Sequence, residues 1–204
     1  MKILGINGSP RKNSITGQMV SEILDATGAE TELINLAGKR ISPCIACLGC
    51  VNDNICKVKD DMYDIREKIV AADAYVIGGA NYYGMVNSLT HAFLERFYQF
   101  FHLDCRDIAG KKAIVVGVAA GDGQPAIDNI RQLLEYNRVE VIGSVSASGP
   151  APCFTCGHGE ECKVGVVHRF FGEGTKITPE IIPTVEKQQD VITKARELAQ
   201  MLAV

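Results

Sequence analysis

The segment Lys2–Thr16, KILGINGSPRKNSIT, decides the fold class of this chain. Within Lys2–Asn7, the apolar residues Ile3, Leu4 and Ile6 do not alternate with polar ones, which predicts a strand that is buried on both faces. A turn rich in Gly, Ser and Pro follows over Asn7–Asn13, and a helix is predicted from about Ser14 to Thr27. A buried strand that leads through a short turn into a helix begins a strand–helix–strand unit, so this segment predicts a parallel sheet.

The rest of the chain repeats this alternation of strands and helices. Further strands are predicted at Glu30–Leu36, Ala74–Gly79, Lys112–Val118 and Val139–Val145. Helices are predicted after Asp60 and Asp61, which we interpret as a helix cap, over Val86–His102, around Ile127–Leu134 and over Thr184–Ala203. We therefore predict the α/β class, with one domain over residues 1–204 and a doubly wound, flavodoxin-like sheet of five parallel strands. The strand order 2-1-3-4-5 comes from the precedent of that fold.

Two segments lie outside the predicted alternation. Residues 37–60 form a long cysteine-bearing loop after the second strand, and residues 146–183 form an irregular C-terminal extension rich in Cys and Gly. The chain has 204 residues, 47% of them hydrophobic and 22% charged, which is typical of a globular protein and excludes a disordered one.

Charge and hydropathy patterns exclude several classes of function. The net charge is -3, and the sequence contains no block of basic residues, so nucleic acid is not expected as a partner. No apolar run reaches the roughly 18 residues of a membrane span. The first residues resemble no signal peptide, so we expect a cytoplasmic protein. Eight cysteines in such a protein indicate metal binding or redox chemistry rather than a disulfide framework.

The turn after the first strand has the composition of a phosphate site. It lies at the carboxyl edge of the predicted sheet and opens a helix, whose N-terminus favours an anion. Ser9, Ser14 and Thr16 supply hydroxyl groups, and Arg11 supplies a positive charge. The segment matches neither the dinucleotide fingerprint nor the nucleotide-hydrolysing P-loop. It therefore indicates a mononucleotide such as FMN, with an ordinary Ser/Gly turn as the alternative.

The pattern Gly-x-x-Gly-Ser-Pro-Arg-x-x-Ser-x-Thr resembles the NAD(P)H-dependent FMN reductase family of flavodoxin-like proteins. This resemblance implies a flavin-dependent oxidoreductase with FMN as cofactor. The residues it assigns to the FMN phosphate are Ser9, Arg11, Ser14, Ile15 and Thr16.

Two more segments resemble flavin-binding loops of the same family. Asn81, Tyr82, Tyr83 and Gly84 follow the third strand and correspond to the loop beside the ribityl chain and flavin ring. Gly121 and Asp122 follow the fourth strand and correspond to the loop at the pyrimidine end. All three segments follow parallel strands and are expected at one edge of the sheet. The chain has no Trp, so stacking on the flavin would fall to one of the two tyrosines, unless both only pack at a helix entry.

The first cysteine set reads C-x2-C-x2-C-x5-C and consists of Cys44, Cys47, Cys50 and Cys56. Thiolates are the usual ligands of a [4Fe–4S] cluster, and the short spacings let one loop surround it. Zinc also takes four thiolates, usually from two separated knuckles, so a zinc site, an empty thiol cluster and plain packing remain alternatives.

An FMN reductase core with this cysteine motif resembles the iron-sulfur flavoproteins of anaerobic archaea and bacteria. The resemblance implies one FMN and one [4Fe–4S] cluster per subunit, with the four cysteines as metal ligands. It also implies a homodimer or homotetramer in which electrons cross between subunits. Ferredoxin or NAD(P)H is the implied donor, and the acceptor would be a small molecule. No side chain is predicted to act as a catalytic acid or base.

Two other functions remain open from the sequence. One is an NAD(P)H-dependent FMN or quinone reductase without a cluster. The other is a non-catalytic, metal-binding redox sensor on the same scaffold.

A second cysteine set lies in the extension and has three members, Cys153, Cys156 and Cys162. With His158 or His168 they could form a zinc site, and Cys153 with Cys156 could form a dithiol beside the flavin. Simple packing is the third alternative. Because the extension follows the last strand, we expect it to fold over the ligand edge as a lid or acceptor pocket.

Overall fold

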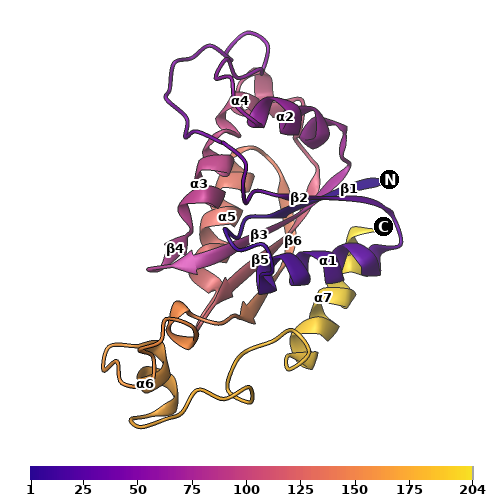
Figure 1. The fold of residues 1–204 in the computed structure, drawn as a ribbon. Coiled ribbons are helices and arrows are strands. Elements are labelled where there is room, and N and C mark those ends of the chain that lie inside the picture. The colour runs from indigo at the N-terminus through magenta and orange to yellow at the C-terminus, as the bar shows by residue number, and fades with distance from the viewer. Residues whose placement is uncertain (204) are drawn as a thin grey trace.

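The computed structural model describes residues 1–203 and contains one mixed sheet (Figure 1). Five parallel strands lie in the order β2-β1-β3-β5-β6. The bounds of these strands are β1 Lys2–Asn7, β2 Glu30–Asn35, β3 Ala74–Tyr82, β5 Lys112–Ala119 and β6 Glu140–Ser148. The predicted order is therefore confirmed for the parallel strands, whose carboxyl ends meet at one edge.

The predicted count of five strands is wrong, because the sheet has a sixth, β4, Met85–Val86. This strand pairs antiparallel with the end of β3, where Asn81 faces Val86. The two-residue turn between them has positive φ at Tyr83 (55°) and Gly84 (81°), as a tight hairpin with right-handed twist requires. A strand of two residues gives no alternation in sequence, which is why the pattern missed it.

Helices cover both faces of the sheet, and a small apolar core lies under each layer (Figure 1). On one face lie α1, Ile15–Thr27, and α7, Gln189–Leu202. On the other lie α2, Met62–Ala71, α3, Ser88–Glu95, and α5, Gln124–Tyr136. Neighbouring residues of β1 enter opposite cores, Ile3 one and Leu4 the other. This double burial explains why the strand sequence does not alternate.

Several predicted boundaries differ from the observed ones, and β3 ends at Tyr82 rather than Gly79. The helix expected over 86–102 is broken, because α3 ends at Glu95 and a short α4, Tyr98–Phe101, follows. At the break, the fully buried Arg96 side chain turns into the loop of residues 37–60, where its Nη1 donates to the carbonyl of Ser42. Strand β6 extends through Ser148, and α7 begins only at Gln189. Both shifts follow from Gln188, whose side chain pairs with the backbone N–H and C=O of Ser148.

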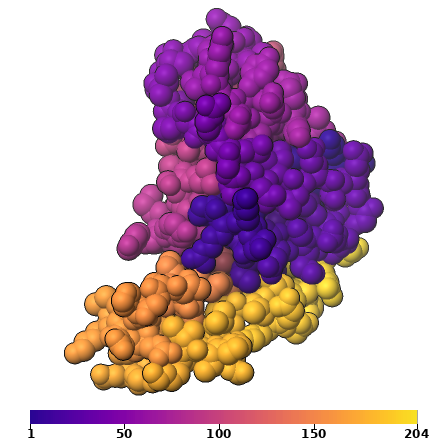
Figure 2. Space-filling model, viewed as in Figure 1, coloured from indigo at the N-terminus to yellow at the C-terminus, as the bar shows by residue number. Residues whose placement is uncertain are grey.

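The extension forms a lobe below the carboxyl edge of the sheet (Figures 1 and 2). It contains a 3-10 turn, Pro152–Phe154, and the short helix α6, Val166–Phe171. Phe154 and Val167 are its buried apolar side chains between residues 149 and 183. With so small a core, its position depends on contacts with the sheet edge. None of the helices in residues 1–203 combines the length and apolar character that a membrane span needs.

Candidate functional site

The turn after β1 is fixed to the sheet and to α3 through Gly8. The Gly8 N–H donates to the carbonyl of Gly78 at 2.9 Å, and its own carbonyl accepts from Asn87 Nδ2 and Thr90 Oγ1, each at 2.9 Å. A Cβ atom at Gly8 would lie 2.0 Å from Thr90 Oγ1. Only glycine fits this approach, so the loop position depends on Gly8.

Side chains of the same turn prepare the N-terminus of α1. Asn7 Oδ1 accepts from the Ser9 N–H at 3.1 Å and from the Ser14 hydroxyl at 3.3 Å. Ser14 is the N-cap, and its hydroxyl accepts from the Gly17 N–H at 3.0 Å. The positive end of the α1 dipole therefore faces the loop, which favours an anion there.

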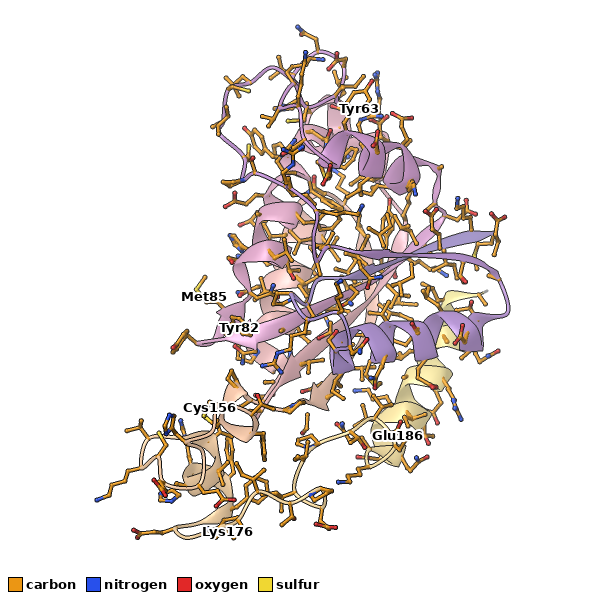
Figure 3. All side chains as sticks on the ribbon, viewed as in Figure 1. Tyr63, Tyr82, Met85, Cys156, Lys176 and Glu186 are labelled. Carbon is orange, nitrogen blue, oxygen red and sulfur yellow. The ribbon has the colours of Figure 1, made fainter. Side chains whose placement is uncertain are left out.

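A cavity of about 560 Å³ opens at the carboxyl edge, within the roughly 300–1,000 Å³ range of cofactor pockets. Figure 2 shows the surface hollowed where the magenta hairpin meets the orange extension. Side chains from two of the three predicted flavin segments line this flavin cavity: Ser9, Arg11, Thr16, Asn81, Tyr82 and Tyr83. The end of β5 and the residue after it, directly before the third segment, contribute Val118, Ala119 and Ala120. Tyr82 and Met85 both lie on the β3–β4 hairpin (Figure 3), and Tyr82 lines the cavity.

The other predicted cofactor residues do not line the cavity themselves. Ser14 caps α1, and Ile15 is buried beside Gly149. The Gly84 N–H donates to Asn81 Oδ1 at 3.0 Å, and the Asp122 carbonyl accepts from Asn81 Nδ2 at 2.8 Å. Among the described residues, five predicted cofactor residues are therefore outside the cavity lining: Ser14, Ile15, Gly84, Gly121 and Asp122.

The extension supplies lining residues that the family resemblance did not include. They are Gly149–Cys153, Val164 and Val166. Arg11 Nη1 donates to the carbonyl of Pro150 at 2.8 Å, which ties the phosphate loop to the extension. The Phe170 ring lies so close to Gly121 that a Cβ there would meet it at 3.0 Å. The sequence signal for these lining residues was the position of the extension directly after the last strand, at the ligand edge of the sheet.

The four cysteines of the first set line a second, small cavity at the loop of residues 37–60. All four are free thiols; Cys50 is buried and Cys47 is exposed. Side chains from α3 and α4 hold the loop backbone, since the Cys44 N–H donates to Glu95 Oε2 at 3.1 Å and the Cys56 N–H donates to Gln99 Oε1 at 3.0 Å. The topology thus brings together the thiols that the sequence grouped by spacing.

A buried ion pair adjoins these thiols. Arg96 Nη1 lies 2.6 Å from Asp60 Oδ2, and Arg96 Nη2 donates to Cys56 Sγ at 3.2 Å. Burial opposes both charges, but the pairing raises the pKa of Arg96 and, with two backbone N–H donors, lowers the pKa of Asp60. Burial, with the neighbouring thiols adding to it, raises the pKa of the Cys50 thiol. Asp60 also accepts from the Ser42 N–H in the loop and from the Met62 N–H at the start of α2. It therefore fixes both the arginine and the loop, which is a wider role than the predicted helix cap.

The four thiols share one cavity. Within residues 1–203, no three His, Cys, Asp or Glu side chains are grouped as ligands of a single metal ion. A [4Fe–4S] cluster makes a different demand, because each thiolate binds a different iron of the cube. The donor set of four thiols around one cavity, with an arginine beside it, fits such a cluster.

Comparison with known proteins identifies the family. The family model described as NADPH-dependent FMN reductase matches residues 1–151. The chain belongs to this family. It is a flavin-dependent oxidoreductase with the FMN reductase fold, as the resemblance in its first loop predicted.

Relatives within the FMN reductase family carry the iron-sulfur flavoprotein name. One, from Methanocaldococcus jannaschii, is 33% identical over 148 residues, which cover 70% of this chain and 76% of the relative. Another, from Methanosarcina thermophila, is 27% identical and covers 93% of this chain and 100% of the relative. The chain is thus a member of the iron-sulfur flavoprotein branch.

A solved structure of a flavone reductase matches the whole chain with a TM-score of 0.61 at 18% identity. The chain spans 62% of that structure's length, so the likeness shows the shared fold alone.

In this FMN reductase family member the two cavities lie at opposite ends of the molecule. The cysteine loop packs near α2 and α4, whereas the extension that closes the flavin cavity lies below the strand ends (Figure 1). No residue lines both cavities in the described chain. The two sites therefore do not adjoin within one chain.

Proposed function

We propose that this protein transfers electrons between a [4Fe–4S] cluster bound by Cys44, Cys47, Cys50 and Cys56 and an FMN bound in the flavin cavity. The observation that carries the proposal is that the four spaced cysteines all line one cavity, in a chain of a flavin-dependent oxidoreductase family. FMN exchanges one or two electrons and the cluster one, so the pair would couple a one-electron donor to a two-electron acceptor.

The protein's part in this function is to bind and orient the two groups. Ser9, Arg11 and Thr16 would hold the FMN phosphate with hydroxyls and one positive charge beside the start of α1. Tyr82 and Tyr83 lie at the rim, where an aromatic ring can stack on the flavin. Ser14, Ile15, Asn81, Gly84, Gly121 and Asp122 would fix the geometry of these loops.

At the cluster, Arg96 would supply the fixed positive charge that Arg11 supplies at the flavin phosphate. Its side chain is 1% exposed and is held by Asp60 and the Ser42 carbonyl, so its charge stays beside the ligand Cys56. A fixed positive charge and a hydrogen bond to sulfur both stabilise the reduced, more negative cluster.

Separation of the cavities supports electron transfer between subunits. An apolar groove borders the cysteine loop, and its lining includes the exposed aromatic residues Tyr98, Phe101 and Tyr136. We propose that subunits pair so that the cluster of one approaches the flavin of another, in a homodimer or homotetramer. Ferredoxin or NAD(P)H would be the donor, and a small molecule the acceptor.

Anaerobic purification followed by absorption spectroscopy and iron analysis tests the cluster. Flavin bands with a broad shoulder near ~400 nm that reduction bleaches are expected. Cys47→Ser should lose most of the iron and keep FMN, because Cys47 lies outside the flavin cavity. Cys105→Ser, at a buried cysteine outside both cavities, is the matched control. Flavin without iron in the unaltered protein would instead support an FMN or quinone reductase without a cluster.

Mixed assemblies test the route between subunits. Subunits carrying Cys47→Ser are combined with subunits carrying Arg11→Ala, at an FMN concentration that fills the former and leaves the latter largely empty. Each parent is then deficient in one centre. If electrons cross between subunits, mixing should restore reduction of FMN by the cluster. Equal inactivity of the mixture and the two parents would contradict this route.

A further inference from the structure

The motif Cys153-Phe154-Thr155-Cys156 lies at the wall of the flavin cavity. It begins in the 3-10 turn Pro152–Phe154, which the chain enters directly after the segment bonded to Arg11. Cys153 itself lines the flavin cavity. The proposed function above leaves this motif without a role.

Local geometry brings the Cys156 thiol back to the backbone of Cys153. The Thr155 N–H donates to the Pro152 carbonyl at 3.0 Å, which closes the turn. Cys156 lies just beyond this turn, which ends at Phe154. The Cys156 thiol donates to the Cys153 carbonyl at 3.6 Å, so its sulfur points back toward the first cysteine. A C-x2-C turn of this kind can form an internal disulfide.

The two thiols differ in surroundings. Cys153 is half-buried, and its Sγ accepts from the Val166 N–H at 3.4 Å, a residue that also lines the flavin cavity. Cys156 is exposed to solvent, and Figure 3 shows it on the extension. Cys153 therefore borders the flavin cavity, and its neighbour Cys156 is open to solvent.

We propose that Cys153 and Cys156 form a redox-active dithiol that exchanges two electrons with the flavin, as a third redox centre of the protein. This inference rests on the proposed position of FMN in the flavin cavity. In the reductive direction, the S–S bond between the two cysteines breaks, and two S–H bonds form. The two electrons and two protons come from reduced FMN, which returns to its oxidised form. The reverse reaction restores the disulfide.

The rest of the cysteine set does not complete a metal site. The Cys162 sulfur packs beside Gly165, where a Cβ would meet it at 3.4 Å. His168 Nε2 lies 3.1 Å from the Glu160 carbonyl. In the described part of the extension, these groups are not gathered as ligands of one ion. The pairing of Cys153 with Cys156 is the arrangement that the turn itself favours.

The first test reads the thiols directly and does not depend on activity. Protein is equilibrated anaerobically in glutathione buffers of graded potential, alkylated, and analysed by mass spectrometry of peptides. A disulfide that joins Cys153 to Cys156, with one midpoint potential, is expected. Cys156→Ser removes an exposed thiol and should abolish the disulfide with the fold intact, and Cys105→Ser should retain it. Three results would each overturn the proposal: thiols that stay reduced at all potentials, a disulfide to Cys162, or one zinc ion per chain that blocks alkylation.

The second test counts electrons in the FMN-loaded protein. Anaerobic reductive titration of the oxidised protein should consume about two more electrons per chain than the same titration of Cys156→Ser. FMN occupancy is measured on both samples before titration. Full occupancy with equal uptake would overturn this proposal and leave the proposed function standing. A protein that retains no FMN would overturn the proposed function, and with it the exchange step.

Discussion

The guanidinium of Arg96 bridges a cluster-site cysteine and a buried carboxylate. Its Nη2 lies 3.2 Å from Cys56 Sγ, and its Nη1 lies 2.6 Å from Asp60 Oδ2. Arg96 interrupts the helix predicted over 86–102, and it brings its charge to a loop some forty residues earlier in the chain. One side chain therefore joins the fold of the α3–α4 break to the electrostatics of the cysteine site.

Replacing Arg96 by Gln should lower the reduction potential of the proposed cluster. The change removes a charged hydrogen bond to sulfur of about 1.5–3 kcal/mol, which is roughly 65–130 mV for one electron if all of it is specific to the reduced state. Potentiometric titration of the cluster absorbance measures the shift. Arg106→Gln, at an exposed arginine, is the control and should leave the potential unchanged. An unchanged potential in a folded, iron-loaded Arg96→Gln protein would contradict this role.

Asp60→Asn should destabilise the protein at neutral pH by about 3 kcal/mol, because it leaves the buried Arg96 charge unpaired. The folded-state pKa of Asp60 is lowered below its ordinary value of 3.8. Its stabilising contribution is therefore present above about pH 4 and is lost as pH falls through the lower, folded-state value. Urea unfolding at several pH values measures the difference in unfolding free energy between the two proteins. This difference should be equal at pH 7 and pH 5 and should become smaller only at more acid pH. A smaller difference at pH 5 than at pH 7 would refute this assignment.

Arg11→Ala should weaken FMN binding about tenfold or more, since a charged hydrogen bond contributes about 1.5–3 kcal/mol. The same change removes the bond to the Pro150 carbonyl and should loosen the extension. Flavin titration of the apoprotein measures affinity, and limited proteolysis reports the extension. Lys12→Ala is the matched control, because Lys12 lines a different hollow of the described surface. Equal affinity of the Arg11→Ala and unaltered proteins would argue against this phosphate position.

Gly8→Ala should displace the phosphate loop, because the added Cβ would overlap Thr90 Oγ1 at 2.0 Å and the Gly78 carbonyl oxygen at 2.6 Å. Overpacking of this kind costs about 1–3 kcal/mol of unfolding free energy. Retained FMN per chain should fall as well. Gly38→Ala is the comparison, since Gly38 has φ +84° and open space around it. That variant should lose about 1–2 kcal/mol through backbone strain and keep its FMN. Similar FMN loss in both variants would show that the loop contact is not the cause.

Much of the fold could be predicted because its signals are local. The run Ile3–Ile6 contains no polar side chain and so favours burial on both faces, and the Gly-Ser-Pro-Arg turn lies between this strand and the helix α1. The spacing of Cys44, Cys47, Cys50 and Cys56 placed four thiols in one short loop, and the structure brings them around one cavity. Strand order followed from fold precedent, and the five parallel strands confirm it.

Tertiary structure alone decided the features that depend on distant partners. The β4 strand is defined by two residues against the end of β3, and the α3–α4 break accompanies a side chain that reaches the Ser42 carbonyl. The place of Pro150 and Cys153 at the flavin cavity depends on how the extension returns to the sheet edge. Periodicity records which face of a segment is buried, but it holds no information on which remote group will pair with a buried arginine or close a cavity. That choice is made by the packing of the whole chain, where each buried polar group must find a partner.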